Sequence, residues 1–101
     1  MEGERAIAKL NRLLENYRSS DPAYTVIVNA AGAVKGAYSA AEECRIEYVL
    51  NRVVALTRYH EYCKKRRLPD EVCSELGAVL WIVETDIPRI LQEKCGCTLR
   101  R

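Results

Sequence analysis

Long apolar runs are missing from this chain of 101 residues. No uninterrupted apolar segment approaches the roughly 18 residues that a helix needs to cross a bilayer, which argues against a membrane-spanning protein. The chain also lacks the basic and then apolar leader of a secreted protein, because residues 1–5 lead directly into an amphipathic segment. We therefore expect a cytoplasmic protein with no membrane partner.

A large excess of charge of one sign is missing too. The 16 basic and 14 acidic side chains leave a formal net charge of only +2, so no strong overall field attracts nucleic acid or anionic lipid. Any such partner must be recognised by a local patch.

Cysteine, in contrast, is plentiful. The chain contains Cys44, Cys63, Cys73, Cys95 and Cys97. Cytosolic thiols normally stay reduced, and the recognised exception is the intracellular proteins of hyperthermophiles, which use structural disulfides. The composition favours that exception, because Gln92 is the only glutamine, Met1 is the only methionine and 30% of the residues are charged. The chain resembles the small, uncharacterised, disulfide-bearing proteins of hyperthermophilic archaea, and this resemblance implies thermostability but no activity.

The length allows a single globular domain over residues 1–101. Its first element is predicted to be an amphipathic helix, because apolar residues recur at helical spacing from Ile7 to Tyr17 with charged residues between them. This helix should end near Ser19.

Residues 24–38 have two interpretations. Two stretches that favour strands surround a turn at Gly32, which predicts a β-hairpin. The alternative is a helix that begins with Asp21 as its cap and Pro22 at its first position. We favour the hairpin, because Gly32 and Gly36 both weaken a helix.

A new helix is predicted to begin at Ser39, because Ser39 and Glu42 have the spacing of a capping box. It should run toward the cationic residues 64–67, which suit the negative end of a helix dipole. A β-ribbon is the alternative within Ala40–Arg66, since the valines, threonine and tyrosines there also favour strands.

The apolar run Ala78–Val83 is predicted to be a buried central strand that follows a short helix. The alternative is one proline-kinked helix from Asp70 to Cys95, for which the apolar residues are also correctly spaced. Gly77 favours the strand, because glycine commonly ends a helix. The expected fold class is therefore α+β, a small sheet with helices packed on one face; an all-α helical bundle is the alternative.

Metal, redox and nucleophilic chemistry each fit the cysteines poorly. A structural zinc site needs two pairs of ligands, each separated by about two to four residues, and the cysteines do not have this spacing. The candidate redox pair in Cys95-Gly96-Cys97 is expected at a helix C-terminus, where the dipole disfavours a thiolate. His60 and Cys63 share a helix face, but no carboxylate can be singled out to orient the histidine. We therefore assign no metal, no cofactor and no catalytic residue.

Binding of RNA or DNA is the leading functional hypothesis. A run of four cations follows two tyrosines on the predicted helix, which combines phosphate neutralisation with aromatic stacking surfaces, and two C-terminal arginines add a second basic point. The expected contact residues are Tyr59, Tyr62, Lys64, Lys65, Arg66, Arg67, Arg100 and Arg101. A solvated basic helix end explains the same residues without a ligand.

The second hypothesis is a homodimeric scaffold with no chemistry of its own. Five cysteines leave at least one thiol unpaired within a monomer, and that thiol can link two subunits. Cys63 with Cys73 is the expected internal disulfide, and Cys44 is expected to bond to Cys95 or Cys97. The remaining member of the last two is the expected intermolecular thiol.

Overall fold

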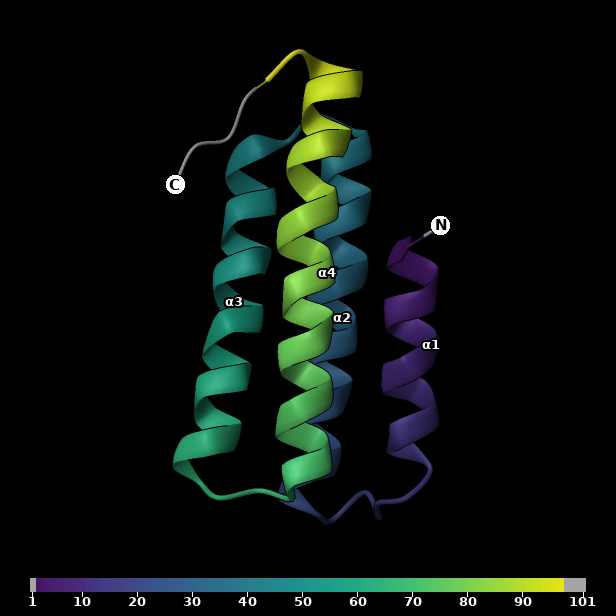
Figure 1. Cartoon of the computed structure of the whole chain (residues 1–101), viewed down its shortest axis with the longest axis vertical. Coiled ribbons are helices and arrows are strands. Elements are labelled where there is room, and N and C mark those ends of the chain that lie inside the picture. The colour runs from purple at the N-terminus through teal and green to yellow at the C-terminus, as the bar shows by residue number, and fades with distance from the viewer. Residues whose placement is uncertain (1, 98–101) are drawn as a thin grey trace.

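A computed structural model describes residues 2–97 of the protein. Within this range the chain forms four helices and no strand. The helices are α1 (Glu2–Leu14), α2 (Pro22–Glu42), α3 (Ile46–Lys65) and α4 (Asp70–Cys95). Each helix runs antiparallel to the one before it, and the longest extent of the molecule is 41 Å (Figure 1).

The predicted sheet is therefore wrong, and the fold is all-helical. Where a hairpin was expected, the chain forms α2. The carboxylate of Asp21 accepts a hydrogen bond from the backbone N–H of Ala23 at 2.9 Å, and Pro22 occupies the first turn. Both features stabilise a helix N-terminus. The helix then continues through Ser39, where a separate helix was expected to begin, and ends at Glu42.

Two glycines misled the sequence-based prediction because both serve helix packing. A Cβ atom at Gly36 would lie 3.1 Å from Cδ of Arg52, and one at Gly77 would lie 3.1 Å from Nε2 of His60. A glycine inside a helix costs about 1 kcal/mol relative to alanine, but these two let side chains of α3 lie directly against the neighbouring helices. Gly77 therefore does not end a helix, and Ala78–Val83 lies in the middle of α4.

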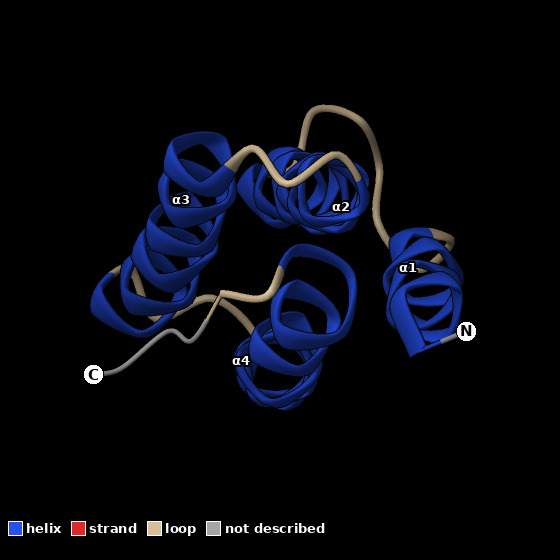
Figure 2. Ribbon diagram, turned by 90° about the horizontal axis from the view of Figure 1, so that it is seen from above, coloured by secondary structure: helices blue, strands red, loops and turns tan. Residues whose placement is uncertain are grey.

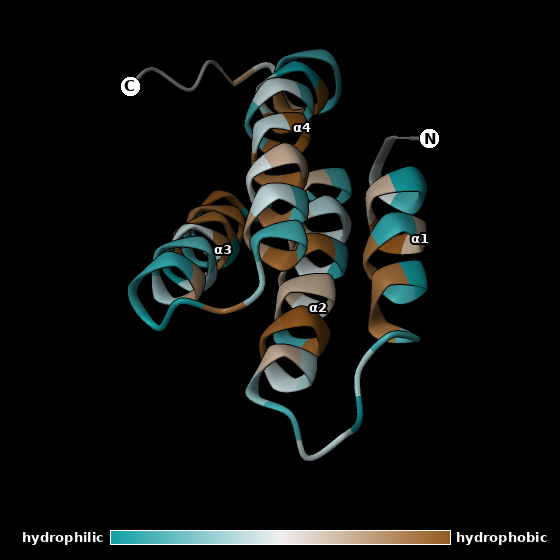
Figure 3. Ribbon diagram, turned by 60° about the horizontal axis from the view of Figure 1, so that its bottom comes forward, coloured by the Kyte–Doolittle hydropathy of each residue, from teal (hydrophilic) through white to brown (hydrophobic). Residues whose placement is uncertain are grey.

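Helices α2 and α4 form the centre of the fold, since each of them contacts the other three helices. Helices α1 and α3 lie on opposite sides of the α2–α4 pair and do not touch each other (Figure 2). Figure 3 shows the hydrophobic side of α1 turned toward α2 and its hydrophilic side turned away. The buried side chains of α2 are mostly small: Ala23, Val26, Ile27, Ala30, Ala33, Val34, Ala37, Tyr38, Ala40 and Ala41. Small side chains allow its neighbours to approach closely.

Two of the helix ends use a left-handed residue other than glycine. Cys44 has φ of 59° and Arg67 has φ of 53°. In each case the backbone N–H of the next residue donates a hydrogen bond to a carbonyl of the helix. Arg45 donates to Ala40 at 2.9 Å, and Leu68 donates to Cys63 at 3.0 Å. This pattern is the Schellman motif, which usually has glycine at the left-handed position. Helices α2 and α3 therefore end in sharp turns.

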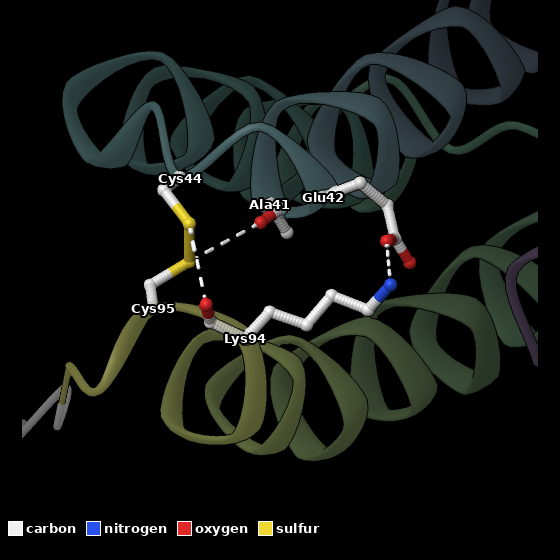
Figure 4. Close-up of polar contacts among 5 residues, drawn as sticks. All are labelled: Ala41, Glu42, Cys44, Lys94 and Cys95. Carbon is white, nitrogen blue, oxygen red and sulfur yellow. Dashed lines mark hydrogen bonds and ion pairs between the residues drawn. A yellow bond between two sulfur atoms is a disulfide. The ribbon is translucent and has the colours of Figure 1, made fainter.

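Two disulfides join the helices near opposite ends of α4. Cys63 and Cys73, the expected internal pair, have Cα atoms 5.6 Å apart. Cys44 is bonded to Cys95, with Cα atoms 5.7 Å apart. Figure 4 shows the second bridge between the end of α2 and the end of α4, together with the ion pair of Lys94 and Glu42. Because disulfide sulfurs carry no hydrogen, their approaches to the carbonyl oxygens of Lys94 and Ala41 are van der Waals contacts.

Helix α1 lies outside both covalent loops. Ala6 and Leu10 are completely buried against the rest of the molecule. Beyond the helix, the hydroxyl of Tyr17 donates a hydrogen bond to the carboxylate of Glu71. Burial and then this bond raise the pKa of Tyr17 to about 12, so the phenol keeps its proton. Noncovalent contacts alone hold α1 in place.

His60 packs between α3 and α4, against Gly77. Partial burial, followed by the nearby charge of Lys64, lowers the pKa of His60 below its usual 6.5, although Glu61 acts in the opposite direction. The fold therefore favours the neutral imidazole.

Removing the Cys44–Cys95 bridge is expected to destabilise the fold. The bridged residues are 51 positions apart, and a loop of that size contributes about 4 kcal/mol in the chain-entropy model. We expect Cys44→Ser with Cys95→Ser to lower the free energy of unfolding by about this amount in a denaturant titration. Cys97→Ser, which leaves both bridges intact, should change it by less than about 0.5 kcal/mol. Equal effects in the two variants would contradict the assignment.

The stability of the protein should depend on the protonation of His60. The pKa of this residue is lower in the folded than in the unfolded chain, so the unfolded chain binds more protons as the pH falls below about 7. We expect the free energy of unfolding to decrease between about pH 7 and pH 5.5. The decrease should be smaller in His60→Gln, because glutamine has no titratable group. Identical pH profiles of the two proteins would argue against this role.

Candidate interaction surfaces

The cationic residues 64–67 occupy the C-terminal end of α3 and the turn that follows it. All four are exposed, but they do not share one side of the helix. Successive residues of an α-helix are separated by about 100°, so Lys64 projects from nearly the opposite side to Tyr62. Arg66 lies on the side of Tyr62, with its guanidinium carbon 5.6 Å from the centre of that ring. Arg100 and Arg101 lie outside the described residues.

Helix α3 instead carries a longer stripe of arginine and tyrosine along one side. Its members alternate in spacing between three and four residues, which keeps them in a line on a helix. They are Arg45, at the N-terminal cap, then Tyr48, Arg52, Ala55, Tyr59, Tyr62 and, at the C-terminal cap, Arg66. The sequence-based prediction included only the last three. The regular spacing was readable from the sequence, but it requires α3 to be identified as one helix.

Small residues of α2 lie beside this stripe. Two hollows open between the helices, one of about 330 Å³ lined by Thr25, Asn29, Tyr59 and Tyr62 among others. The other, of about 340 Å³, is lined by Gly32, Lys35, Gly36, Ser39, Ala40, Glu43, Arg45 and Tyr48. We call the stripe and the α2 residues that line these hollows the α2–α3 seam. Small side chains on one wall and long ones on the other make the seam concave.

Tyr48 organises the upper part of the seam. The guanidinium carbons of Arg45 and Arg52 both lie 4.8 Å from the centre of its ring, within the range of a cation–π interaction. The Nε atom of Arg52 is buried and has no hydrogen-bond partner within residues 2–97. Both guanidinium groups therefore lie against the same aromatic ring.

A second surface lies on the outer side of α3 and α4. Trp81 is 68% exposed, the highest value among the large hydrophobic side chains that the structure exposes, and Leu50 and Val54 are 46% and 49% exposed. Leu50 and Val54 are four residues apart on α3 and so share one side of the helix. We call these three residues the α3–α4 face. No function at this position was predicted from the sequence.

The pairing of the two helices brings the members of the α3–α4 face together. Cys63 is bonded to Cys73, and one turn along His60 contacts Gly77. Since the helices are antiparallel, Trp81 lies about one turn further, beside the level of Thr57. Val54 and Leu50 then follow within about 10 Å along the axis. The three exposed apolar side chains therefore lie at neighbouring levels of the two paired helices.

Four of the five cysteines form cross-links between helices. Cys63 and Cys95 lie in different bridges toward opposite ends of α4. Cys95 is bonded to Cys44 and not to Cys97, whose thiol donates a weak hydrogen bond to the Cys95 carbonyl at 3.5 Å. Within residues 2–97 no three histidine, cysteine or carboxylate side chains are grouped as metal ligands. Cys63, in its bridge, has no thiol for His60 to activate.

None of the described helices is both long enough and apolar enough to cross a membrane. Comparisons with protein-family models, with curated proteins and with solved structures find no match to this chain. The features that bear on its function are therefore the two surfaces described above, the α2–α3 seam and the α3–α4 face.

Proposed function

We propose that the protein is a non-enzymatic interaction protein that forms a homodimer through the α3–α4 face. The observation that carries this proposal is the 68% exposure of Trp81, with the exposed Leu50 and Val54 at neighbouring levels of the paired helix. Single apolar residues are normal on protein surfaces, but tryptophan is enriched in interfaces and an exposed group of apolar side chains marks an interaction site. Buried tryptophans are also among the residues that contribute most to binding.

A second copy of the chain is the partner that fits this surface best. A twofold axis places a patch against the same patch of the other copy, and an apolar patch is complementary to itself. Arg58 and Glu61, both exposed, lie next to the patch on α3 and carry opposite charges. A twofold axis near Trp81 would bring the arginine of each copy toward the glutamate of the other. Such an arrangement would satisfy the charges at the rim of the interface.

The unpaired Cys97 is not needed for this dimer. Its side chain is half-buried just beyond the end of α4, whereas Trp81 lies about 21 Å before that end at 1.5 Å per residue. The apolar face would therefore hold the subunits together without a covalent bond. An intermolecular disulfide at Cys97 remains a separate proposal that the same experiment can test.

Trp81→Ser is expected to weaken the dimer by at least about 30-fold, which corresponds to the loss of about 2 kcal/mol at an interface residue of this kind. Size-exclusion chromatography with light scattering measures the effect as a change from twice the 11.5 kDa chain mass to the monomer mass. Val28→Ser is the matched control, because Val28 is 43% exposed but lies on α2.

Two further results decide the proposal. Cys97→Ser should keep the dimer mass; its conversion to a monomer would show that a covalent bond at Cys97 is responsible instead. Wild-type protein that remains monomeric at about 100 μM, a concentration that populates even weak dimers, would refute the homodimer.

A further inference from the structure

We propose that the α2–α3 seam binds single-stranded nucleic acid. This inference does not depend on the proposed dimer, because the seam lies where α3 meets α2, whereas the dimer would use the side of α3 that adjoins α4. The residues that carry it are the arginines and tyrosines of the α3 stripe. Arg45, Tyr48 and Arg52 are new members that the cationic run 64–67 does not include.

The length of the seam suits an extended strand. From Arg45 to Arg66 the stripe spans 21 residues, or about 31 Å at the rise of an α-helix. Phosphates of an extended strand are separated by roughly twice the 3.4 Å rise of a stacked strand, so that length corresponds to about five phosphates. A segment of several nucleotides can therefore contact both hollows at once.

The charges of the seam are arranged for a chain of phosphates. Lys35, Arg45, Arg52 and Arg66 are distributed along it, and Glu43, near one end, is the only carboxylate that lines its two hollows. Arginine binds phosphate through several N–H donors in a planar group. An elongated anion can contact all of these cations at once, whereas a compact anion would contact only one or two.

The aromatic rings favour nucleic acid over an acidic peptide. Tyr48 and Tyr62 are each 41% exposed, and Tyr59 lines the lower hollow together with Tyr62. Bases stack on tyrosine rings and on the planes of arginine side chains, whichever base is present. In a duplex the bases already stack on each other, so their faces are not available to the protein. Single strands therefore match both the charges and the rings.

Part of this site is already ordered before any ligand binds. The stem of Arg52 lies across Gly36, where any larger side chain would displace it, and its head group lies over Tyr48. A side chain that is already fixed loses less entropy when it binds. Arg45 and Arg52 lie against the same ring, and a phosphate placed there could bind to both. This part of the seam is the centre of the proposed site.

The proposal is tested by fluorescence anisotropy with labelled oligonucleotides of about 12 nucleotides, as single-stranded RNA, single-stranded DNA and the matching DNA duplex. We expect either single strand to bind more tightly than the duplex. Four phosphate contacts predict a slope of about −2.8 for log affinity against log salt. A preference between the two single strands would identify the sugar that the seam accepts.

Two double variants with equal changes of charge provide the decisive comparison. Arg45→Gln with Arg52→Gln removes two cations from the seam and should weaken binding at least tenfold at low salt. The slope of log affinity against log salt should become less steep by about 1.4. Lys64→Gln with Lys65→Gln removes two cations from α3 that the seam does not include, and should leave the affinity within about twofold. Tyr62→Leu should weaken binding about fivefold or more through lost stacking. Circular dichroism verifies that each variant remains helical.

Several results would overturn the proposal. Equal losses in the two double variants would mean that binding depends on overall charge and not on the seam. Tighter binding of polyglutamate than of the oligonucleotides would identify an acidic protein segment as the ligand instead. No binding of single strands at low salt would remove nucleic acid as a partner. Trp81→Ser is tested in parallel. It should bind the oligonucleotides as the wild type does even if it is a monomer, because each monomer contains the whole seam, so the two proposals can fail independently.

Discussion

The structure depends on the packing of α2 against three other helices at once. Small buried side chains let neighbouring helices approach closely on several sides, and alanine supplies six of the ten buried positions on α2. Alanine also has the highest helix propensity, because its side chain loses no conformational entropy. The same residues therefore stabilise α2 as a helix and allow α1, α3 and α4 to surround it. The concave seam between α2 and α3 is a consequence, since the α2 residues that line it are also mostly small.

The sequence predicted some elements correctly because their signals are local. The amphipathic pattern identified the first helix, although α1 ends at Leu14 and not near Ser19, and a turn after residue 66 indicated the pairing of Cys63 with Cys73. The predicted strands were wrong because Gly36 and Gly77 were interpreted by their conformational freedom alone. In the structure they leave space for Arg52 and His60, which are distant in sequence. A contact of this kind is not visible until the helices are placed together, so the balance between hairpin and helix could not be decided beforehand.

The two surfaces were missed for the same reason, because their residues come together only when the helices have formed and packed. The tyrosines and cations near the end of α3 are conspicuous in the sequence because they are close together. The members of the stripe from Arg45 to Arg66 are separated in sequence by two or three other residues. They line up only because α3 is one uninterrupted helix. Trp81 was interpreted as part of a buried strand, since its neighbours are apolar. On a helix, unlike a strand, residues two apart do not share a side, and Trp81 is exposed while Val79 and Val83 are buried.

The position of the disulfides divides the molecule into unequal parts. Both bridges lie between residues 44 and 95, so α3 and α4 are linked near both ends, whereas α1 has no covalent link beyond the backbone. Proteins open locally as well as globally, and the parts with the fewest constraints open first. Helix α1 can thus separate from α2 and α4 while the cross-linked helices stay assembled. Amide hydrogen exchange in α1 would then report a smaller opening free energy than in α3, and the molecule would behave as a stable unit of three helices from which the first helix can separate.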